Sequence, residues 1–222
     1  MPRSSPRLPW EVIERIIDHS SGRPKTLHNL ALTCRQLRPR SRCVAFGLVK
    51  LKSNNRIFTF IDFILDNPDL KPHVYTIIVS PASLGPSLLY VLPNLSSIEC
   101  EGTEPGQRMT GSNRLHLHHS SLAAFRSHGT HVQTLRLQHV SFSSGAFIRV
   151  LLALTSLTHL TCMNVEGVMA NGNKAHLEGL KRRLSKQMCL KTLTVSVLHL
   201  VVGTNISELK CGYFIGRLIP RF

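Results

Sequence analysis

The chain has few acidic side chains and no long apolar run. Its 222 residues include 27 lysines and arginines but only 12 aspartates and glutamates, a formal net charge of +15. The most apolar stretch, Leu193 to Val202, is interrupted by Ser196 and His199 and is shorter than the ~18 residues of a membrane span. Met1 to Trp10 has arginines but no apolar segment typical of a secretory signal. We therefore expect no membrane partner and a cytoplasmic or nuclear location.

The sequence also lacks the motifs of common enzymes and metal sites. Its six cysteines include no C-x-x-C pair, which argues against a zinc knuckle, and we expect them to be reduced. Neither glycine-rich phosphate loops nor H-E-x-x-H or G-x-S-x-G are present. The metal-like cluster His116, His118 and His119, with His128 and His131 beyond it, has no third or fourth ligand fixed by spacing. We predict a protein that is not an enzyme, with no catalytic residues, no metal site and no cofactor.

What the chain does have is an unusually apolar first segment. If residues 8–17 form a helix, Val12, Ile13, Ile16 and Ile17 sweep about 140° of its circumference. A helix that faces one core usually needs about 100°. The excess predicts two apolar neighbours for this helix, the rest of the chain and a partner. The alternative is that all of these side chains face the chain's own second domain.

A second amphipathic segment follows. Apolar residues recur in it at helical spacing: Leu27, Leu30, Ala31, Cys34 and Leu37. We predict Thr26 as the helix cap and Pro39 as the residue that stops the helix. Leu32 lies about 140° from Leu27 around the helix. Next to the wide apolar arc of the first helix, Leu32 is therefore a candidate contact for the same partner.

These two segments resemble the F-box, most closely the F-box-like proteins of fungi. The resemblance rests on L-P-x-E-V-I-x-x-I-I from Leu8 and L-x-x-L-A-L-T-C-R from Leu27, and Arg40-Ser41-Arg42 also has a counterpart. It implies docking into an apolar groove of the Skp adaptor, and through it association with cullin–RING ligase subunits. The positions carried over as adaptor contacts are Leu8, Pro9, Val12, Ile13, Ile16, Ile17, Leu27, Leu30, Leu32, Cys34 and Arg35. The chain departs from the family at Leu37, where tryptophan is frequent, and at Ser20-Ser21-Gly22, which replaces a more apolar helix end.

Basic residues are concentrated after the second segment. Seven occur without an intervening acid: Arg35, Arg38, Arg40, Arg42, Lys50, Lys52 and Arg56. Such a run is typical of contact with nucleic acid or anionic lipid. However, it lacks the interleaved aromatic residues of a base-stacking surface, because Phe46 and Phe58 have core spacing. We favour a solvated basic face that steers the chain toward an acidic partner, with nucleic-acid binding as the alternative.

The remainder alternates between strand and helix patterns. An amphipathic helix is predicted from Asn54 to Asn67, and from residue 73 an apolar-x-x-apolar-x-apolar pattern recurs. Its copies begin at Val74, Leu95, Val132, Leu157 and Leu190, with a poor copy at Leu115–Leu117 and a short imitation at Ile206–Cys211. Segments with helical spacing lie between them, such as residues 147–154 and 177–184. This alternation is similar to irregular leucine-rich repeats, and Val132–Cys162 resembles the second half of the same fungal proteins.

We therefore predict a mixed α+β or α/β fold in three parts. An F-box three-helix unit spans 1–48, a linking strand and amphipathic helix span 49–72, and an irregular leucine-rich-repeat-like solenoid with short parallel strands spans 73–222. Alternate residues of such strands point outward and pave a shallow concave face. The outward set, predicted to bind an unidentified protein substrate, is Ser97, Glu99, Thr134, Arg136, Gln138, His159, Thr161, Met163, Thr192 and Thr194.

Together these features predict a substrate-recognition adaptor subunit of an SCF-type ubiquitin ligase. Such a subunit contributes proximity, because it presents a target lysine to the transferring subunits at high effective concentration. Two alternatives remain at this stage. One is a basic protein that binds nucleic acid, and the other is an F-box scaffold without a link to ubiquitin.

Overall fold

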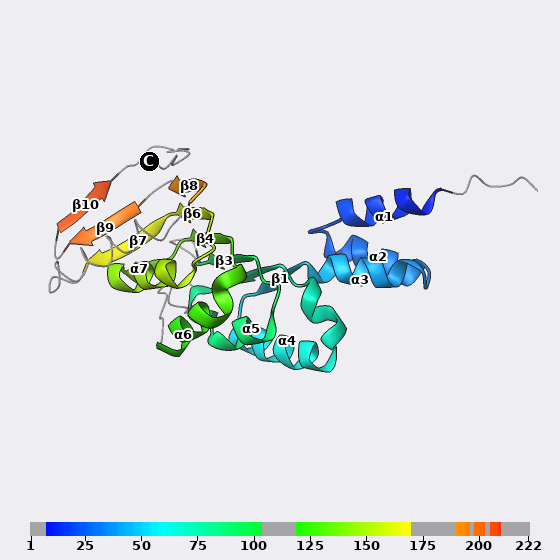
Figure 1. The fold of residues 1–222 in the computed structure, drawn as a ribbon. Helices are drawn as coiled ribbons and strands as arrows, with labels where there is room; N and C mark the ends of the chain where they lie inside the picture. Colours follow the sequence, from blue (N-terminus) through cyan, green and yellow to red (C-terminus); the bar gives the residue numbers. More distant parts are fainter. Residues whose placement is uncertain (1–7, 104–118, 170–189, 196–197, 203–204, 210–222) are drawn as a thin grey trace, which may run out of the picture. The chain divides into compact units, whose positions relative to one another are not determined.

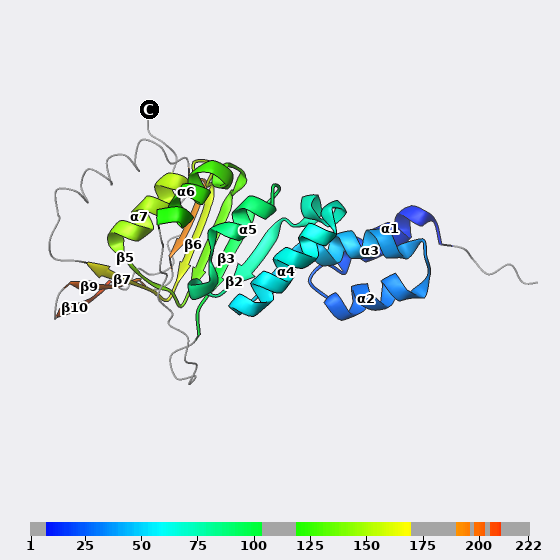
Figure 2. The ribbon, with the colours of Figure 1, turned by 90° about the horizontal axis from the view of Figure 1, so that it is seen from below.

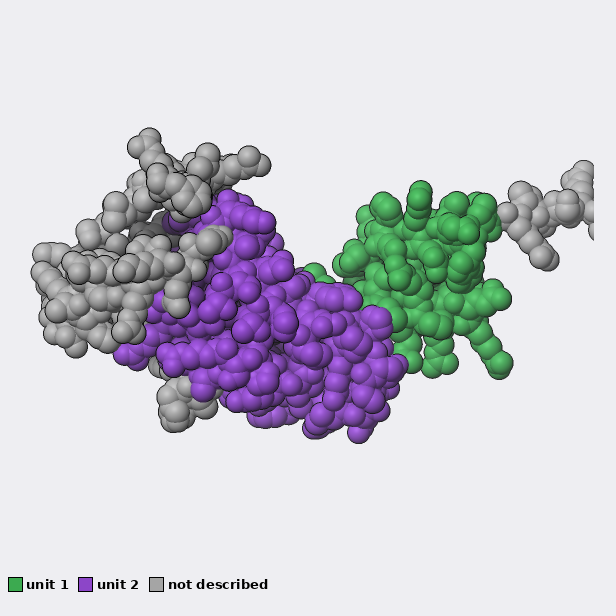
Figure 3. Space-filling model, in the orientation of Figure 1, with its two compact units in different colours: residues 1–49 green, residues 50–222 purple. Residues whose placement is uncertain are grey.

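The chain folds into two compact units, residues 1–49 and 50–222, coloured green and purple in Figure 3. This computed structural model describes residues 8–103, 119–169, 190–195, 198–202 and 205–209. The predicted linking segment 49–72 belongs to the second unit except for its first residue. Among the described residues, no helix is both long and apolar enough to cross a membrane.

Three helices make up the described part of the first unit: α1 (Trp10–His19), α2 (Pro24–Thr33) and α3 (Leu37–Phe46) (Figure 1). Gly22 turns the chain between α1 and α2. Its φ of 79° is a backbone conformation that glycine adopts without a steric penalty. Each helix contributes one buried side chain to a small core, from Ile17, Leu27 and Leu37. This unit is therefore organised around a core of its own.

The predicted limits of the second helix were wrong at both ends. It begins at Pro24 with Arg23 as the N-cap residue, so Thr26 is not the cap. Pro24 is well tolerated there because its fixed φ suits the first helical position. The last residue of the helix is Thr33; Cys34, which follows it, has an extended backbone, and α3 begins at Leu37. Pro39 lies in the first turn of α3, where backbone N–H groups have no partner within the helix. The missing N–H of proline is therefore tolerated there, and Pro39 does not end the second helix as predicted.

The second unit is built on a sheet with strand order β1-β2-β3-β4-β6-β8. Its strands are β1 (Leu48–Leu51), β2 (Thr76–Val79), β3 (Ser97–Glu101), β4 (Thr134–Gln138), β6 (His159–Met163) and β8 (Thr192–Val195). From β2 to β8 all neighbours are parallel. The predicted parallel strands are thus confirmed, each at the position of one apolar-x-x-apolar-x-apolar copy.

In the part of the chain that the structure describes, four helices cover one face of this sheet: α4 (Asn54–Asp66), α5 (Pro86–Val91), α6 (His119–His128) and α7 (Ser144–Ala153) (Figures 1 and 2). Short 3-10 turns lie at Pro68–His73, Pro81–Ser83 and Gly129–His131. Helix α4 has the predicted limits and buries Ile57, Phe60 and Ile64. Phe58, which we expected in the core, is 62% exposed, because it lies on the opposite side of α4 from these residues.

The core between sheet and helices follows the strand alternation. Ile98, Leu135 and Leu160 form one buried row across three neighbouring strands. Two residues further along each strand, Cys100 and Cys162 are also buried, and both are free thiols. Burial raises the pKa of each thiol to about 12. These two cysteines therefore serve as small apolar core residues, as predicted.

A second sheet, which the sequence analysis missed, has the order β10-β9-β7-β5. Its strands are β5 (Ser141–Ser143), β7 (Val165–Met169), β9 (Leu198–Val202) and β10 (Asn205–Leu209). His139 and Asn164, with φ of 52° and 51°, turn the chain from β4 toward β5 and from β6 toward β7. β10 pairs antiparallel with β9, so the described part of the short imitation, Ile206–Leu209, lies in this second sheet. The poor copy at Leu115–Leu117 and the predicted helix at 177–184 lie outside the described residues.

Candidate functional site

Helix α1 divides its apolar residues between the core and the surface. Ile17 is fully buried and Ile13 packs against the same core. Ile16 is 48% exposed, and Val12 and Leu8 are also exposed. Successive helical residues differ by about 100° in direction, which places Ile16 and Ile17 on different faces. The apolar residues of α1 that do not pack in the core are therefore on the surface.

Helix α2 shows the same division. Leu27 is buried and Leu30 packs against the core, whereas Leu32 is 71% exposed and is the most exposed large apolar side chain among the described residues. We define the N-terminal apolar surface by four residues: Leu8, Val12, Ile16 and Leu32.

The eleven predicted adaptor contacts thus fall into two groups. Seven are on the surface: Leu8, Pro9, Val12, Ile16, Leu32, Cys34 and Arg35. Four lie in the core of the first unit or pack against it: Ile13, Ile17, Leu27 and Leu30. The second group holds α1 and α2 in position, and its fully buried members, Ile17 and Leu27, can meet a partner only with a change of fold. Sequence reasoning did not select Trp10, which is 39% exposed on α1 and donates an Nε1 hydrogen bond to Glu14 Oε1 at 3.1 Å.

A two-pronged ion pair fixes α1 against α3. Arg40 donates from Nε to Asp18 Oδ1 at 2.9 Å and from Nη2 to Asp18 Oδ2 at 2.7 Å. The hydrogen bonds and charge of Arg40 hold the pKa of the Asp18 carboxyl below its ordinary value. Paired geometry of this kind restrains direction as well as distance. The exposed residues of α1 are thereby presented at a set angle to the rest of the first unit.

On the second unit, all ten predicted outward residues lie on one face of the sheet. They occupy alternate positions of β3, β4, β6 and β8, opposite the buried rows. The strand register aligns them across the sheet: Ser97 with Thr134, His159 and Thr192, and Glu99 with Arg136, Thr161 and Thr194. We call this the polar sheet face; it comprises Ser97, Glu99, Thr134, Arg136, Gln138, His159, Thr161, Met163, Thr192 and Thr194.

The charges on the polar sheet face are paired. Arg136 Nη1 lies 3.3 Å from Glu99 Oε1, and at the end of β3 Lys52 Nζ lies 3.1 Å from Glu101 Oε2. The remaining members are mostly hydroxyl or amide side chains. This face is therefore polar but carries little net charge, in contrast to the chain as a whole.

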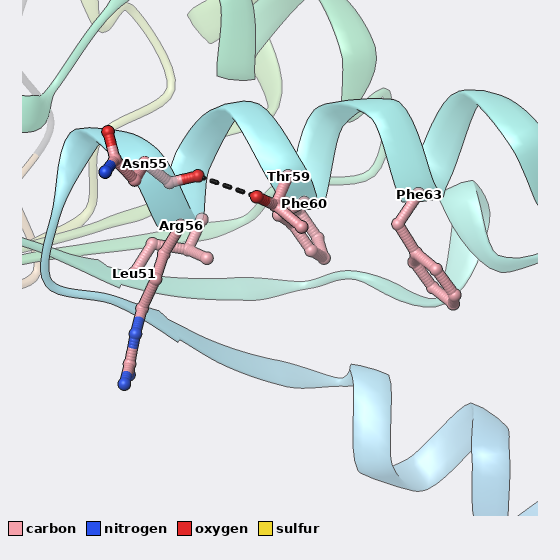
Figure 4. A pocket seen from close by; sticks show the side chains of 6 residues that line it. All are labelled: Leu51, Asn55, Arg56, Thr59, Phe60 and Phe63. Atoms are coloured by element: carbon pink, nitrogen blue, oxygen red, sulfur yellow. Dashed lines mark hydrogen bonds between the residues drawn. The ribbon is translucent and has the colours of Figure 1, made fainter.

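A shallow apolar hollow of about 410 Å³ runs along α4. Figure 4 shows its lining and the bond from Thr59 Oγ1 to Asn55 O at 2.9 Å. The lining residues are Leu51, Asn55, Arg56, Thr59, Phe60 and Phe63. This set contains no carboxylate, histidine or cysteine to act as a base, nucleophile or metal ligand.

Within the described residues, no group of three histidine, cysteine or acidic side chains is placed to hold a metal ion. His116 and His118 of the predicted cluster lie outside the described residues. His128 packs edge-on against Tyr90, with ring centroids 4.5 Å apart.

Neither the family models nor the curated proteins with which the chain was compared give a match.

Proposed function

We propose that the chain is a substrate-recognition adaptor of an SCF-type ubiquitin ligase. The first unit binds the Skp adaptor, which links it to the cullin–RING subunits, and the polar sheet face binds a protein target. The observation that carries this proposal is the exposure of Ile16 and Leu32 beside a core that Ile17 and Leu27 already complete. The exposed residues belong to the sequence stretch that resembles the F-box.

The size of the first unit supports a role for a partner. Units of about 40 residues seldom bury enough apolar surface to be stable without additional support. Full burial of a leucine or isoleucine side chain contributes at most about 1.5–3 kcal/mol. Because Ile16 and Leu32 are 48% and 71% exposed, much of that contribution is still available to a groove that covers them.

The second unit supports the proposed repeat architecture. From β4 the chain passes through His139, whose backbone is left-handed, into β5 and then into α7. The order of strand, left-handed residue and second strand recurs in β6, Asn164 and β7. Each first-sheet strand from β2 to β8 lies beside the next in register, as in a solenoid whose units bury their apolar faces on their neighbours. We propose that these units form an irregular leucine-rich-repeat-like solenoid and that its open strand face holds the target.

The docking proposal is tested with the full chain and purified Skp adaptor in a pull-down. We expect Ile16→Asp combined with Leu32→Asp to abolish capture, because a carboxylate in an apolar groove costs several kcal/mol. Phe58→Asp combined with Leu65→Asp is the matched control, since these α4 residues are 62% and 53% exposed.

Both double variants should keep the circular dichroism of the unchanged chain, because all four residues are surface residues. Capture that survives in the Ile16/Leu32 variant, or is lost equally in the α4 control, contradicts docking through the N-terminal apolar surface.

A further inference from the structure

The surroundings of Leu32 have charge of one sign. Residues 19–61 contain no aspartate or glutamate, although they span α2, α3, β1 and most of α4. Within the same range lie nine lysines and arginines: Arg23, Lys25, Arg35, Arg38, Arg40, Arg42, Lys50, Lys52 and Arg56. The acids of the first unit's described residues, Glu11, Glu14 and Asp18, all lie on α1. The unit is therefore acidic on α1 and basic on α2 and α3.

Basic side chains flank Leu32 on both sides. Lys25 is seven residues before Leu32 on α2, which places it on the same helix face about 10 Å away along the axis. Arg35 is three residues after Leu32, so their Cα atoms are at most about 11 Å apart. The backbone positions of both basic residues therefore lie about one Debye length from Leu32 at an ionic strength near 0.1 M.

These charges are available to a partner. Arg40 is committed to Asp18, but Lys25, Arg35 and Arg38 are exposed, and the described residues form no salt bridge with any of them. Clustered charge of one sign around an apolar contact raises the association rate with an oppositely charged surface and has less effect on dissociation. We define the basic flank as Lys25 and Arg35, which precede and follow Leu32, together with Arg38 in the first turn of α3. These exposed charges of one sign suit a steering surface.

We propose that the partner surface that receives Leu32 is acidic around its apolar groove, and that the basic flank accelerates docking onto it. This inference rests on the proposed binding of the Skp adaptor. It adds that the part of the adaptor surface that contacts Leu32 is negatively charged. A protein partner explains the features better than nucleic acid does. Leu32 is a large exposed apolar side chain between Lys25 and Arg35 in the sequence, and no phenylalanine, tyrosine or tryptophan of α2 or α3 is exposed for stacking on bases.

The test measures association and dissociation rates of the full chain on immobilised Skp adaptor at 50 and 500 mM salt. The flank variant carries Lys25→Gln and Arg38→Gln and keeps Arg35, which is also a predicted adaptor contact. A matched control carries Arg126→Gln and Arg149→Gln, which removes the same charge from exposed positions of the second unit.

We expect the unchanged chain to associate about tenfold more slowly at 500 mM than at 50 mM salt. At 50 mM the flank variant should associate about fivefold or more slowly than the control, with dissociation rates within about twofold. Equal association rates of flank variant and control overturn the inference while leaving adaptor binding intact. Absence of adaptor binding by the unchanged chain at either salt concentration is instead the failure of the proposed function itself.

A labelled 20-nucleotide RNA is the competitor in the same experiment. If RNA binds the unchanged chain at 50 mM salt and displaces the adaptor, and the flank variant loses this binding, the flank serves a polyanion and the inference is wrong. If RNA does not displace the adaptor and the flank variant associates more slowly than the control, the flank serves the acidic protein surface.

Discussion

Ile16 and Ile17 are adjacent on α1 but have opposite environments, which makes the pair a sharp test of the first unit. Ile17 is 0% exposed and packs with Leu27 and Leu37. Ile17→Ala removes three buried carbon groups, worth about 0.8 kcal/mol each, and leaves a cavity. We expect a loss of about 3 kcal/mol. Small domains have about 0.05–0.15 kcal/mol of stability per residue, or about 2.5–7 kcal/mol for a unit of 49 residues, so this loss should remove a large part of the first unit's stability.

The chain provides its own probe for this experiment. Trp10 is the only tryptophan and lies in α1, so its fluorescence during urea unfolding reports on the first unit. We expect Ile17→Ala to abolish or strongly lower the urea midpoint. Ile16→Ala, at a 48% exposed position, should change the free energy of unfolding by less than about 1 kcal/mol.

Similar effects of the two substitutions would refute the division of α1 into a core face and a surface face. A loss below about 0.5 kcal/mol for Ile17→Ala would show that the core formed by Ile17, Leu27 and Leu37 is not the one that holds the unit together.

Two further predictions concern the ion pair and the thiols. Arg40 lowers the pKa of Asp18, so the stabilisation from this pair is present above the ordinary carboxyl pKa of about 4 and is lost as pH falls through the lowered value. Asp18→Asn should therefore cost about 0.5–1 kcal/mol at pH 6 and much less at pH 2, measured by urea unfolding at both pH values. Iodoacetamide at pH 8 should label exposed Cys34 but not Cys100 or Cys162, whose pKa is raised to about 12 by burial. Mass spectrometry with and without denaturant checks this, and native labelling of Cys100 would contradict its burial.

The apolar spacing of the sequence predicted most of the first sheet and α4. Five copies of one short pattern preceded or contained β2, β3, β4, β6 and β8, because a strand that is buried on one face must alternate. The limits of α2 and α3 could not be read in the same way. A proline breaks a helix in its interior but is tolerated in its first turn. Which of these applies to Pro39 depends on where the preceding helix ends, and it ends before the extended residue Cys34.

The second sheet was missed for a different reason. The turns into β5 and β7 use left-handed backbone at His139 and Asn164. Glycine would have signalled such a turn clearly, whereas histidine and asparagine adopt this conformation at only a minority of their positions. In the first unit, the sequence indicated that α1 has too much apolar surface for one core. Which residues form the excess depended on the direction in which α1 packs, which leaves Ile16 outside and Ile17 inside.

We propose that Leu8, Val12, Ile16 and Leu32, which are exposed in the chain alone, are covered by a Skp adaptor in the complex. The sharpest test is a titration of the folded full chain with purified adaptor, followed through the fluorescence of Trp10, which lies on α1. We expect saturable binding with a stoichiometry of one to one and a Kd of about 1 µM or tighter. No binding at about 100 µM adaptor, by a chain whose circular dichroism shows it to be folded, would contradict it.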